Sequence, residues 1–278
     1  MTASPVPSSP GHIAFIGGGN MARSLIGGLV ARGADPATIH VAEPVEALRQ
    51  ALATDFGVRV HADATEAVAG ADLWLLAVKP QVMRAVCESL AGQAQASRPL
   101  VVSIAAGITI ASLQQWLGGE LPVVRCMPNT PALLGAGATG LYAGPGVSQA
   151  QRERAGQVLG SAGITVWIER EALMDAVTAV SGSGPAYVFL LAEAMQAAAE
   201  AEGLAPEAAR ALVVQTLLGA GRMLAESGEP AAELRRRVTS PGGTTQAAIE
   251  RFQADGFEAM VARAIAAARQ RGAELAGG

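Results

Sequence analysis

A glycine-rich turn between a predicted strand and a predicted helix restricts the possible folds of this chain most narrowly. The apolar run His12–Ile16 is typical of a buried strand, and a helical pattern covers Ala22–Ala31. Between them the chain reads Gly17-Gly18-Gly19-Asn20-Met21-Ala22, which matches G-x-G-x-x-A. In a dinucleotide-binding βαβ unit the first glycine makes the sharp turn, the second lets a pyrophosphate approach the backbone, and the alanine permits close packing of helix on strand. The turn predicts a dinucleotide site, with a purely structural turn as the alternative.

Strand and helix patterns continue to alternate after this turn as far as residue 168. Such alternation predicts an α/β fold with a doubly wound, mostly parallel sheet and helices on both of its faces. The predicted strands are His12–Ile16, Thr38–Ala42, Val58–His61, Asp72–Val78, Leu100–Ile104, Val123–Met127, Gly140–Tyr142 and Thr165–Ile168. The predicted helices between them are Ala22–Ala31, Val45–Ala53, Thr65–Ala69, Val82–Leu90, Ile110–Leu117 and Ser148–Gly160.

The pattern changes near Glu169, where strands stop and helices follow one another. The segment Tyr187–Leu191 is apolar nearly all round its helix, which is typical of a helix buried in a bundle or between subunits. Charged residues make up only 16% of the chain, against roughly 25% in an average soluble protein, so we expect a large oligomer interface. The predicted helices are Leu173–Val180, ended by Ser181–Gly184, and then Ala186–Ala201, Pro206–Glu226, Ala231–Val238, Thr245–Ala254 and Phe257–Ala276.

These patterns predict a disordered tail at residues 1–10, a dinucleotide-binding Rossmann domain at 11–168, and an all-α substrate and dimerisation domain at 169–278. The tail has no apolar run and is not a signal peptide, and no later window is apolar for the ~18 residues of a membrane span. A net charge of −4 and a pI near 5.5 argue against nucleic acid and acidic membranes as partners. Cys87 and Cys126 lack metal-ligand spacing and fit reduced thiols in a cytoplasmic protein.

Candidate cofactor contacts stand at the carboxyl ends of predicted strands, where the ligands of doubly wound sheets collect. Glu43 follows the glycine turn by about 20 residues, at the place of an acid that contacts ribose hydroxyls and repels a 2′-phosphate. A solvated acid at a helix start explains Glu43 equally well, and Arg49 could bind a phosphate, so NAD(H) and NADP(H) both stay open. Lys79, the only lysine, is a candidate cofactor contact, with a solvated strand-end lysine as the alternative. Asn129 and Thr130 are candidates for lining the nicotinamide pocket.

A second turn, Ser240-Pro241-Gly242-Gly243-Thr244-Thr245, stands directly before a predicted helix late in the chain. Pro241 presets one backbone angle, and the two glycines allow positive φ. The helix start offers unpaired N–H groups and the positive end of the helix dipole, which suit a small carboxylate. An ordinary turn with a threonine cap explains the same residues. The nearby run Arg235-Arg236-Arg237 is interpreted as a solvated helix end rather than as a carboxylate clamp.

Six segments in one order give the chain after its tail a resemblance to the pyrroline-5-carboxylate reductase family. They are FIGGGNMA, LLAVKPQ, VVSIAAGIT, MPNTPALLGAG, SGSGPAYVFLLAEAM and VTSPGGTTQAAIE. The resemblance implies reduction of the cyclic imine 1-pyrroline-5-carboxylate to L-proline, the final step of proline biosynthesis, with NADP(H) or NAD(H) as hydride carrier. It also implies a helical domain that interlocks with a second copy, and dimers that assemble into larger rings such as a decamer.

The resemblance also implies site residues, position by position. Cofactor contacts carry over to Ile16, Gly17, Gly18, Gly19, Asn20, Met21, Glu43, Ala77, Val78, Lys79, Pro80, Ile104, Ala105 and Ala106. Substrate contacts carry over to Ser240, Gly242, Gly243, Thr244 and Thr245. The chain departs from the family in two places. Relatives often carry a side-chain amide where this chain has Ala64, and a neutral residue where it has Glu43, which weakens an assumption of strict NADPH use.

The chemistry of imine reduction suggests which residues are catalytic. Protonation or hydrogen bonding of the ring nitrogen draws electrons from the adjacent carbon, which then accepts hydride from the nicotinamide. Thr245 is predicted to hydrogen-bond that nitrogen and help deliver the proton, while amides around Gly243 to Thr245 bind the substrate carboxylate. Lys79 is the second candidate, for electrostatic help.

Two other functions stay open at this point. A β-hydroxyacid dehydrogenase shares the glycine turn but needs a lysine on the first long helix after the Rossmann domain, and no lysine follows Lys79. A non-catalytic nucleotide-binding regulator would not need the Pro-Gly-Gly-Thr-Thr turn. The histidines His12, His40 and His61 fall on or beside predicted strands, and we assign none of them a catalytic role.

Overall fold

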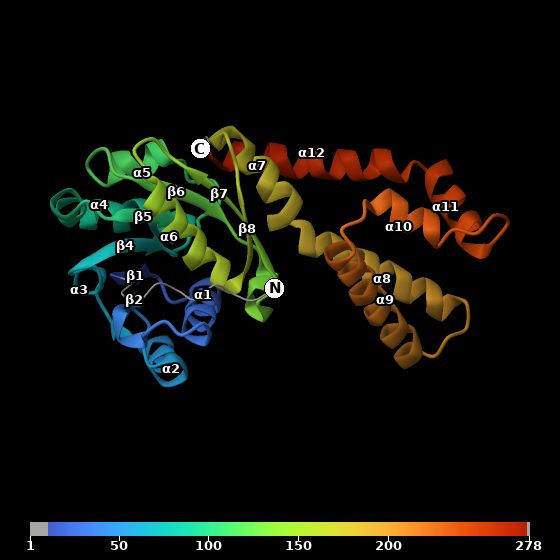
Figure 1. Ribbon diagram of the computed structural model, residues 1–278, viewed down its shortest axis with the longest axis horizontal. Helices are drawn as coiled ribbons and strands as arrows, with labels where there is room; N and C mark the ends of the chain where they lie inside the picture. Colours follow the sequence, from blue (N-terminus) through green and yellow to red (C-terminus); the bar gives the residue numbers. More distant parts are fainter. Residues whose placement is uncertain (1–10, 277–278) are drawn as a thin grey trace. The chain divides into compact units, whose positions relative to one another are not determined.

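The computed structural model describes residues 11–276, so the predicted tail at residues 1–10 lies outside the described residues. Its contacts divide the chain into two compact units (Figure 1). The first comprises residues 11–183 together with 268–276, and the second comprises Gly184–Ala267. The division falls later than the predicted boundary between residues 168 and 169, because the segment after the last strand still packs on the sheet.

The first unit contains one eight-stranded sheet in the order β3-β2-β1-β4-β5-β6-β7-β8. Neighbouring strands are parallel except for β6 and β7, which are antiparallel. The sheet order reverses between β1 and β4, and ligands of such sheets bind outside the carboxyl ends of the strands at this switch point. The predicted doubly wound, mostly parallel sheet is confirmed. Its strands are β1 His12–Ile16, β2 Ile39–Ala42, β3 Arg59–His61, β4 Ala71–Leu76, β5 Leu100–Ser103, β6 Val123–Met127, β7 Gly137–Ala143 and β8 Gly163–Trp167.

Helices cover both faces of this sheet (Figure 1). Successive strand residues point to opposite faces, so Phe15 packs with Leu25 of α1 in one core while Ile16 packs with Met83 of α4 in the other. Because both faces are buried, these strands read as continuous apolar runs. The α-helices are α1 Asn20–Ala31, α2 Glu46–Phe56, α3 Ala64–Ala67, α4 Pro80–Ser97, α5 Ile110–Trp116, α6 Gln149–Leu159 and α7 Met174–Val177. Short 3-10 turns are η1 Pro36–Thr38, η2 Thr130–Leu134, η3 Gly160–Ala162 and η4 Glu171–Leu173.

The helix predicted over Leu173–Val180 does not end at the Ser-Gly-Ser-Gly segment as expected. Residues Thr178–Gly182 instead form a π-helical turn, η5, that continues α7, and Ser183 N–H donates to the Thr178 carbonyl at 2.8 Å. Ser181 donates its hydroxyl to the Val177 carbonyl at 3.0 Å. These hydrogen bonds pair backbone groups of the widened turn. The small residues of this segment therefore form a π-helical turn that continues the helix instead of ending it. Isolated π turns of this kind are frequent at functional sites.

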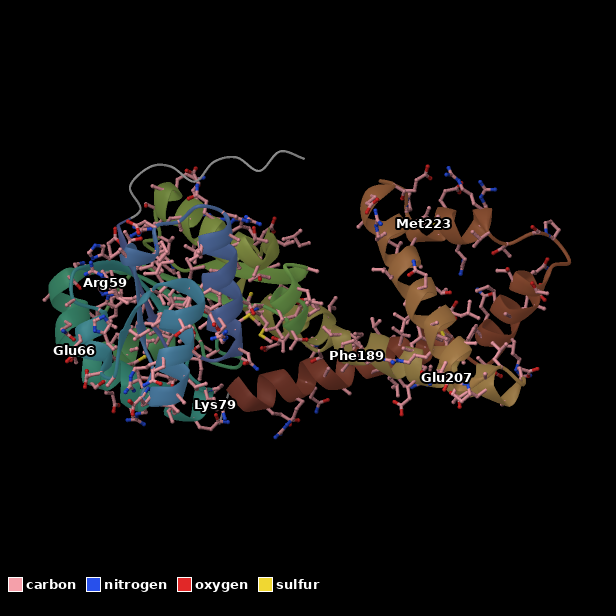
Figure 2. All side chains as sticks on the ribbon, turned by 90° about the horizontal axis from the view of Figure 1, so that it is seen from below. Arg59, Glu66, Lys79, Phe189, Glu207 and Met223 are labelled. Atoms are coloured by element: carbon pink, nitrogen blue, oxygen red, sulfur yellow. The ribbon has the colours of Figure 1, made fainter. Side chains whose placement is uncertain are left out.

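The second unit is entirely helical and leaves large apolar side chains exposed. Its helices are α8 Gly184–Ala201, α9 Pro206–Glu226, α10 Ala231–Arg237, α11 Thr244–Ala254 and the first part of α12 Phe257–Ala276. Helices α8 and α9 pack together and bury Ala209 and Val213. Phe189 is nevertheless 66% exposed and Met223 is 52% exposed (Figure 2). Many large exposed apolar side chains on one unit favour an interaction face, in agreement with the expected oligomer interface.

Three histidines stack across the first three strands. The rings of His12 and His40 lie 5.1 Å apart between centroids, and those of His40 and His61 lie 5.2 Å apart. The His40 side chain is buried. Burial first, and then the nearby His61, His12 and Arg59, hold the pKa of His40 below its ordinary value of 6.5. The Glu66 carboxylate lies 3.4 Å from His61 Nδ1 at one end of the stack.

Replacement of His40 with leucine is expected to make the fold less sensitive to acid. A histidine whose pKa is lower when folded adds stability that is present above the unfolded pKa and is lost as the pH falls through the folded pKa. The wild-type free energy of unfolding should therefore fall more steeply below pH 6.5 than that of His40→Leu. Urea titrations over a pH series measure both slopes. Equal slopes for wild type and His40→Leu would contradict this assignment.

Candidate active site

The glycine turn joins β1 to α1 in the conformation that a dinucleotide requires. Gly17 has φ of 105°, and a Cβ there would lie 2.8 Å from the Ala77 carbonyl oxygen, so only glycine fits. Gly19 is the N-cap of α1 and is exposed, and a Cβ on it would meet no atom within 4 Å. The first N–H groups of α1 therefore face open space at the positive end of the helix dipole, which suits the pyrophosphate of a dinucleotide.

Backbone hydrogen bonds bring the predicted cofactor contacts together at the carboxyl ends of neighbouring strands. Gly17 N–H donates to the Ala42 carbonyl at 2.9 Å, and Ala77 N–H donates to the Ile16 carbonyl at 2.8 Å. Ile104 N–H donates to the Leu76 carbonyl at 3.2 Å. The ends of β2, β1, β4 and β5 thus form one continuous rim. The predicted residues Val78 and Ala105 follow directly on this rim, while Asn20 and Met21 open α1 beside it.

Glu43 is not the solvated acid that one interpretation expected. It is only 7% exposed, and its carboxylate accepts N–H groups from Gly18 and Val45, both at 3.0 Å. Arg49 lies against the same segment, with Nη1 donating to the carbonyl oxygens of Glu43 and Pro44, both at 2.7 Å. The acid at the end of β2 is therefore fixed against the glycine turn, where it can accept hydrogen bonds from ribose hydroxyls.

Lys79 is exposed at the N-cap of α4, directly after the end of β4 (Figure 2). Its ammonium group has no salt-bridge partner among the described residues. Pro80 occupies the first position of α4, where its missing N–H costs nothing. Lys79 and Pro80 therefore start a helix at the same rim, and the ammonium is free to meet a negatively charged ligand.

Asn129 uses both ends of its amide within the protein. Its Nδ2 donates to the Ser181 carbonyl at 3.0 Å, and its Oδ1 accepts the Ala138 N–H at 2.9 Å. The amide thereby ties the end of β6 to β7 and to the π-helical turn. One N–H of the amide remains for a ligand, so its predicted contact with cofactor stays a prediction. Sequence reasoning missed Ser181 as a partner, because nothing local relates positions 52 residues apart.

The second predicted turn lies in the helical unit and begins α11. Gly242 has φ of 68°, as the Pro-Gly-Gly pattern predicts, whereas Gly243 is an extended N-cap. Gly243 N–H donates to the Ser240 carbonyl at 3.0 Å, so this amide is already engaged within the turn. Thr244 and Thr245 keep their N–H groups and hydroxyls free of hydrogen bonds to any described residue. The groups available to a carboxylate are thus those of the two threonines.

Two neighbours complete the surroundings of this turn. Gln246, which sequence reasoning missed, accepts the Gly242 N–H at 2.7 Å and so fixes the turn to the helix. A glutamine at the third position of a helix is a known capping signal. Arg236 and Arg237 pair with Glu233 at 2.7 and 3.1 Å, respectively. The arginines therefore stand exposed in the last turn of α10 and are paired within it, as expected of a solvated helix end.

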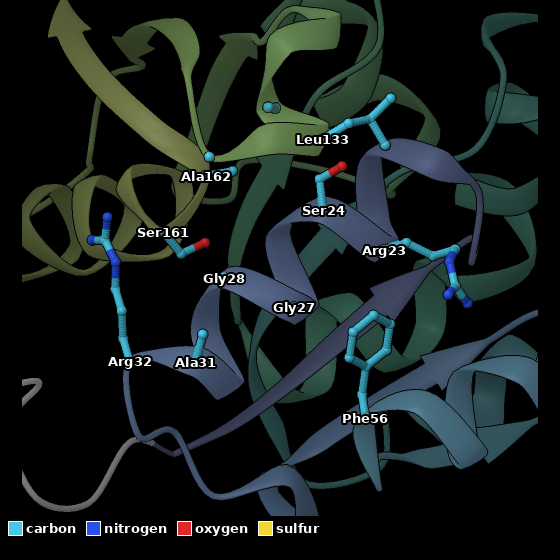
Figure 3. Close-up of a pocket in the computed structure, with 12 residues that line it drawn as sticks. Arg23, Ser24, Gly27, Gly28, Ala31, Arg32, Phe56, Leu133, Ser161 and Ala162 are labelled. Atoms are coloured by element: carbon cyan, nitrogen blue, oxygen red, sulfur yellow. The ribbon is translucent and has the colours of Figure 1, made fainter.

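A groove of about 490 Å³ runs along the outer side of α1 (Figure 3). Arg23, Arg32, Phe56 and Leu133 are among its lining residues. None of the predicted cofactor or substrate residues lines it. It shares no lining residue with the rim described above, and we assign it no role in the site.

The doubly wound sheet, its open glycine turn and the helical unit define an NAD(P)H-dependent oxidoreductase with a dimerisation domain. A family model described as NADP oxidoreductase, coenzyme F420-dependent, matches residues 12–107. A model described as pyrroline-5-carboxylate reductase dimerisation matches residues 171–275. The pyrroline-5-carboxylate reductase of Pseudomonas aeruginosa is 58% identical over 265 residues, which cover 95% of this chain and 97% of the relative. The chain belongs to the pyrroline-5-carboxylate reductase family.

Solved structures agree with this assignment. A pyrroline-5-carboxylate reductase from Coxiella burnetii is similar with a TM-score of 0.93 and 40% identity, covering 96% of this chain and 99% of that one. The Plasmodium falciparum enzyme, solved with NADP bound, has a TM-score of 0.83 and 28% identity, covering 96% and 98%. A 3-hydroxyisobutyrate dehydrogenase from Mycobacterium tuberculosis is 22% identical with a TM-score of 0.50, covering 71% and 67%. That likeness reflects the fold alone.

Proposed function

We propose that this protein reduces 1-pyrroline-5-carboxylate to L-proline with NAD(P)H, the final step of proline biosynthesis. The observation that carries the proposal is the pair of complementary sites on one chain of this family. One is the open N-terminus of α1 beside Gly19, and the other is the unpaired start of α11 at Thr244 and Thr245. The first suits a dinucleotide, and the second suits a small carboxylate.

The substrate carboxylate is proposed to accept hydrogen bonds from the N–H groups of Thr244 and Thr245. The turn that orients these N–H groups then consists of Ser240, Gly242 and Gly243, because the Gly243 N–H donates to the Ser240 carbonyl. The half-buried Thr245 hydroxyl is proposed to hydrogen-bond the ring nitrogen and help deliver its proton. Bound cofactor supplies the hydride chemistry. Lys79 is proposed to add a positive charge at the rim of the sheet.

The helical domain is proposed to form a homodimer, with dimers assembling into a decamer. Support comes from the exposed apolar side chains of α8 and α9 and from the dimerisation domain over residues 171–275. Sedimentation of the purified protein at several concentrations measures both steps.

A cytoplasmic location is proposed from the state of the cysteines. Cys87 and Cys126 are buried and unpaired, and burial raises the pKa of Cys87 to about 12. Within the described range, no helix is long and apolar enough to cross a membrane. Fractionation of cells with antibody against the protein tests the location.

The activity is tested by following the absorbance of NADH and of NADPH in the presence of 1-pyrroline-5-carboxylate. The expected result is a loss of absorbance with the imine and reduced cofactor, and no gain of absorbance with a hydroxyacid and oxidised cofactor. Binding of dinucleotide without any turnover of the imine would favour the non-catalytic regulator. Turnover of the hydroxyacid instead would favour the β-hydroxyacid dehydrogenase.

A further inference from the structure

We propose that Glu43 makes this reductase select NADH over NADPH, and that Arg49 becomes a phosphate ligand only when the Glu43 charge is removed. The inference rests on the proposed function, because it concerns the dinucleotide that this same site accepts. The observation that carries it is a buried carboxylate between the glycine turn and α2, at the end of β2.

The Glu43 carboxylate is held on both sides. One oxygen accepts the Gly18 N–H and the other accepts the Val45 N–H, each at 3.0 Å. The Glu43 backbone is fixed as well, because its N–H donates to the His61 carbonyl at 3.0 Å. A carboxylate bonded in this way cannot turn aside to admit a bulky anion without breaking both hydrogen bonds and leaving the buried Gly18 N–H unpaired.

The fixed charge discriminates between the two cofactors by electrostatics. Ribose hydroxyls can donate hydrogen bonds to the free lone pairs of a carboxylate, which stabilises NADH at this position. In NADPH a 2′-phosphate takes the place of the 2′-hydroxyl, so one hydrogen-bond donor is replaced by a group with about two negative charges. At 7% exposure Glu43 is only weakly screened by water, so the repulsion exceeds that between two solvated anions.

Arg49 contacts the Glu43 backbone, yet it does not neutralise the Glu43 carboxylate. Its Nη1 is bonded to the backbone carbonyls of Glu43 and Pro44, and no salt bridge joins the Arg49 and Glu43 side chains within the described residues. The guanidinium is half-buried and oriented by these carbonyls, with Nη2 and Nε unused. Removal of the Glu43 charge therefore leaves a positioned arginine that can bind a phosphate.

The experiment compares dissociation constants of NAD⁺ and NADP⁺ by calorimetry, alongside kcat/KM for NADH and NADPH. Wild type should favour the NAD(H) forms by about tenfold or more, as expected for a like-charge penalty. Glu43→Ser, which removes the charge and makes room, should reduce that ratio by about tenfold to a hundredfold, mainly through tighter NADP⁺ binding. Glu43→Ser combined with Arg49→Met should lose the gained NADP⁺ affinity.

Glu46→Gln is the matched control, because Glu46 is an exposed acid in the first turn of the same α2. Its cofactor ratio should stay at the wild-type value. A wild-type preference for NADPH would overturn the inference and leave the proposed function standing. Because this measurement uses the wild-type protein, it tests the inference even if a Glu43 variant does not fold. An unchanged ratio in folded Glu43→Ser also overturns it. Failure of both dinucleotides to bind wild type would instead refute the proposed function.

Discussion

Replacement of Thr245 with alanine is expected to lower kcat for imine reduction by about 10²-fold or more, the usual size of a lost general-acid contact. The Thr245 hydroxyl is half-buried and has no hydrogen-bond partner among the described residues, so it is available to the ring nitrogen. Thr245 N–H remains in the alanine variant and continues to bind the carboxylate. The affinity for NAD(P)H should therefore stay unchanged, and KM should change much less than kcat. Steady-state kinetics with calorimetric cofactor binding measure all three quantities.

Two further variants separate chemistry from structure at this position. Thr245→Ser keeps a hydroxyl and should recover most of the rate. Thr54→Ala removes an exposed threonine of α2, outside the helical unit, and should behave as wild type. Wild-type kcat in Thr245→Ala would remove the proposed role of the hydroxyl, and Lys79 would then be the remaining candidate for electrostatic help.

Loss of the buried Arg125 is expected to destabilise the first unit by about 3 kcal/mol, as when one partner of a buried ion pair is removed. Arg125 lies on β6, and its side chain is only 6% exposed. It meets Glu171 at 3.2 Å and Asp175 at 3.6 Å, so it joins the sheet to the segment that follows β8. Glu171 also accepts the Ile110 N–H at 2.8 Å, at the start of α5. Arg125→Met preserves the aliphatic volume but leaves two carboxylates facing each other without a cation.

Urea titration at one fixed protein concentration measures this loss, since the stability of an oligomer depends on concentration. Arg84→Met is the control, because Arg84 and Glu88 form an exposed pair that contributes roughly 0.5 kcal/mol. Adding Glu171→Gln and Asp175→Asn to Arg125→Met should recover part of the stability by removing the unpaired charges. A loss in Arg125→Met as small as that in Arg84→Met would show that the buried pair adds little.

Much of the secondary structure of both units could be predicted from local patterns. The strands β1 and β6 and the helices α9 and α12 have the predicted bounds. Helix α4 extends beyond the predicted Val82–Leu90 to Pro80–Ser97. Its end is rich in alanine and glutamine, which are good helix formers but carry little apolar periodicity. The π-helical turn was missed because glycine and serine usually punctuate helices, and only side-chain bonds such as Ser181 to Val177 show that the helix continues.

The order of residues alone specified the alternating strands and helices, the glycine turn, the Pro-Gly-Gly turn and the family, because these depend on periodicity and on the backbone freedom of neighbouring residues. It left Glu43 equally compatible with a solvated acid and a ribose ligand. Folding removed the solvated alternative by bringing Gly18 to the Glu43 carboxylate from 25 positions away. Folding likewise enclosed Arg125 with Glu171, 46 positions away. Burial and pairing between such distant groups arise from packing in three dimensions, which no local pattern encodes.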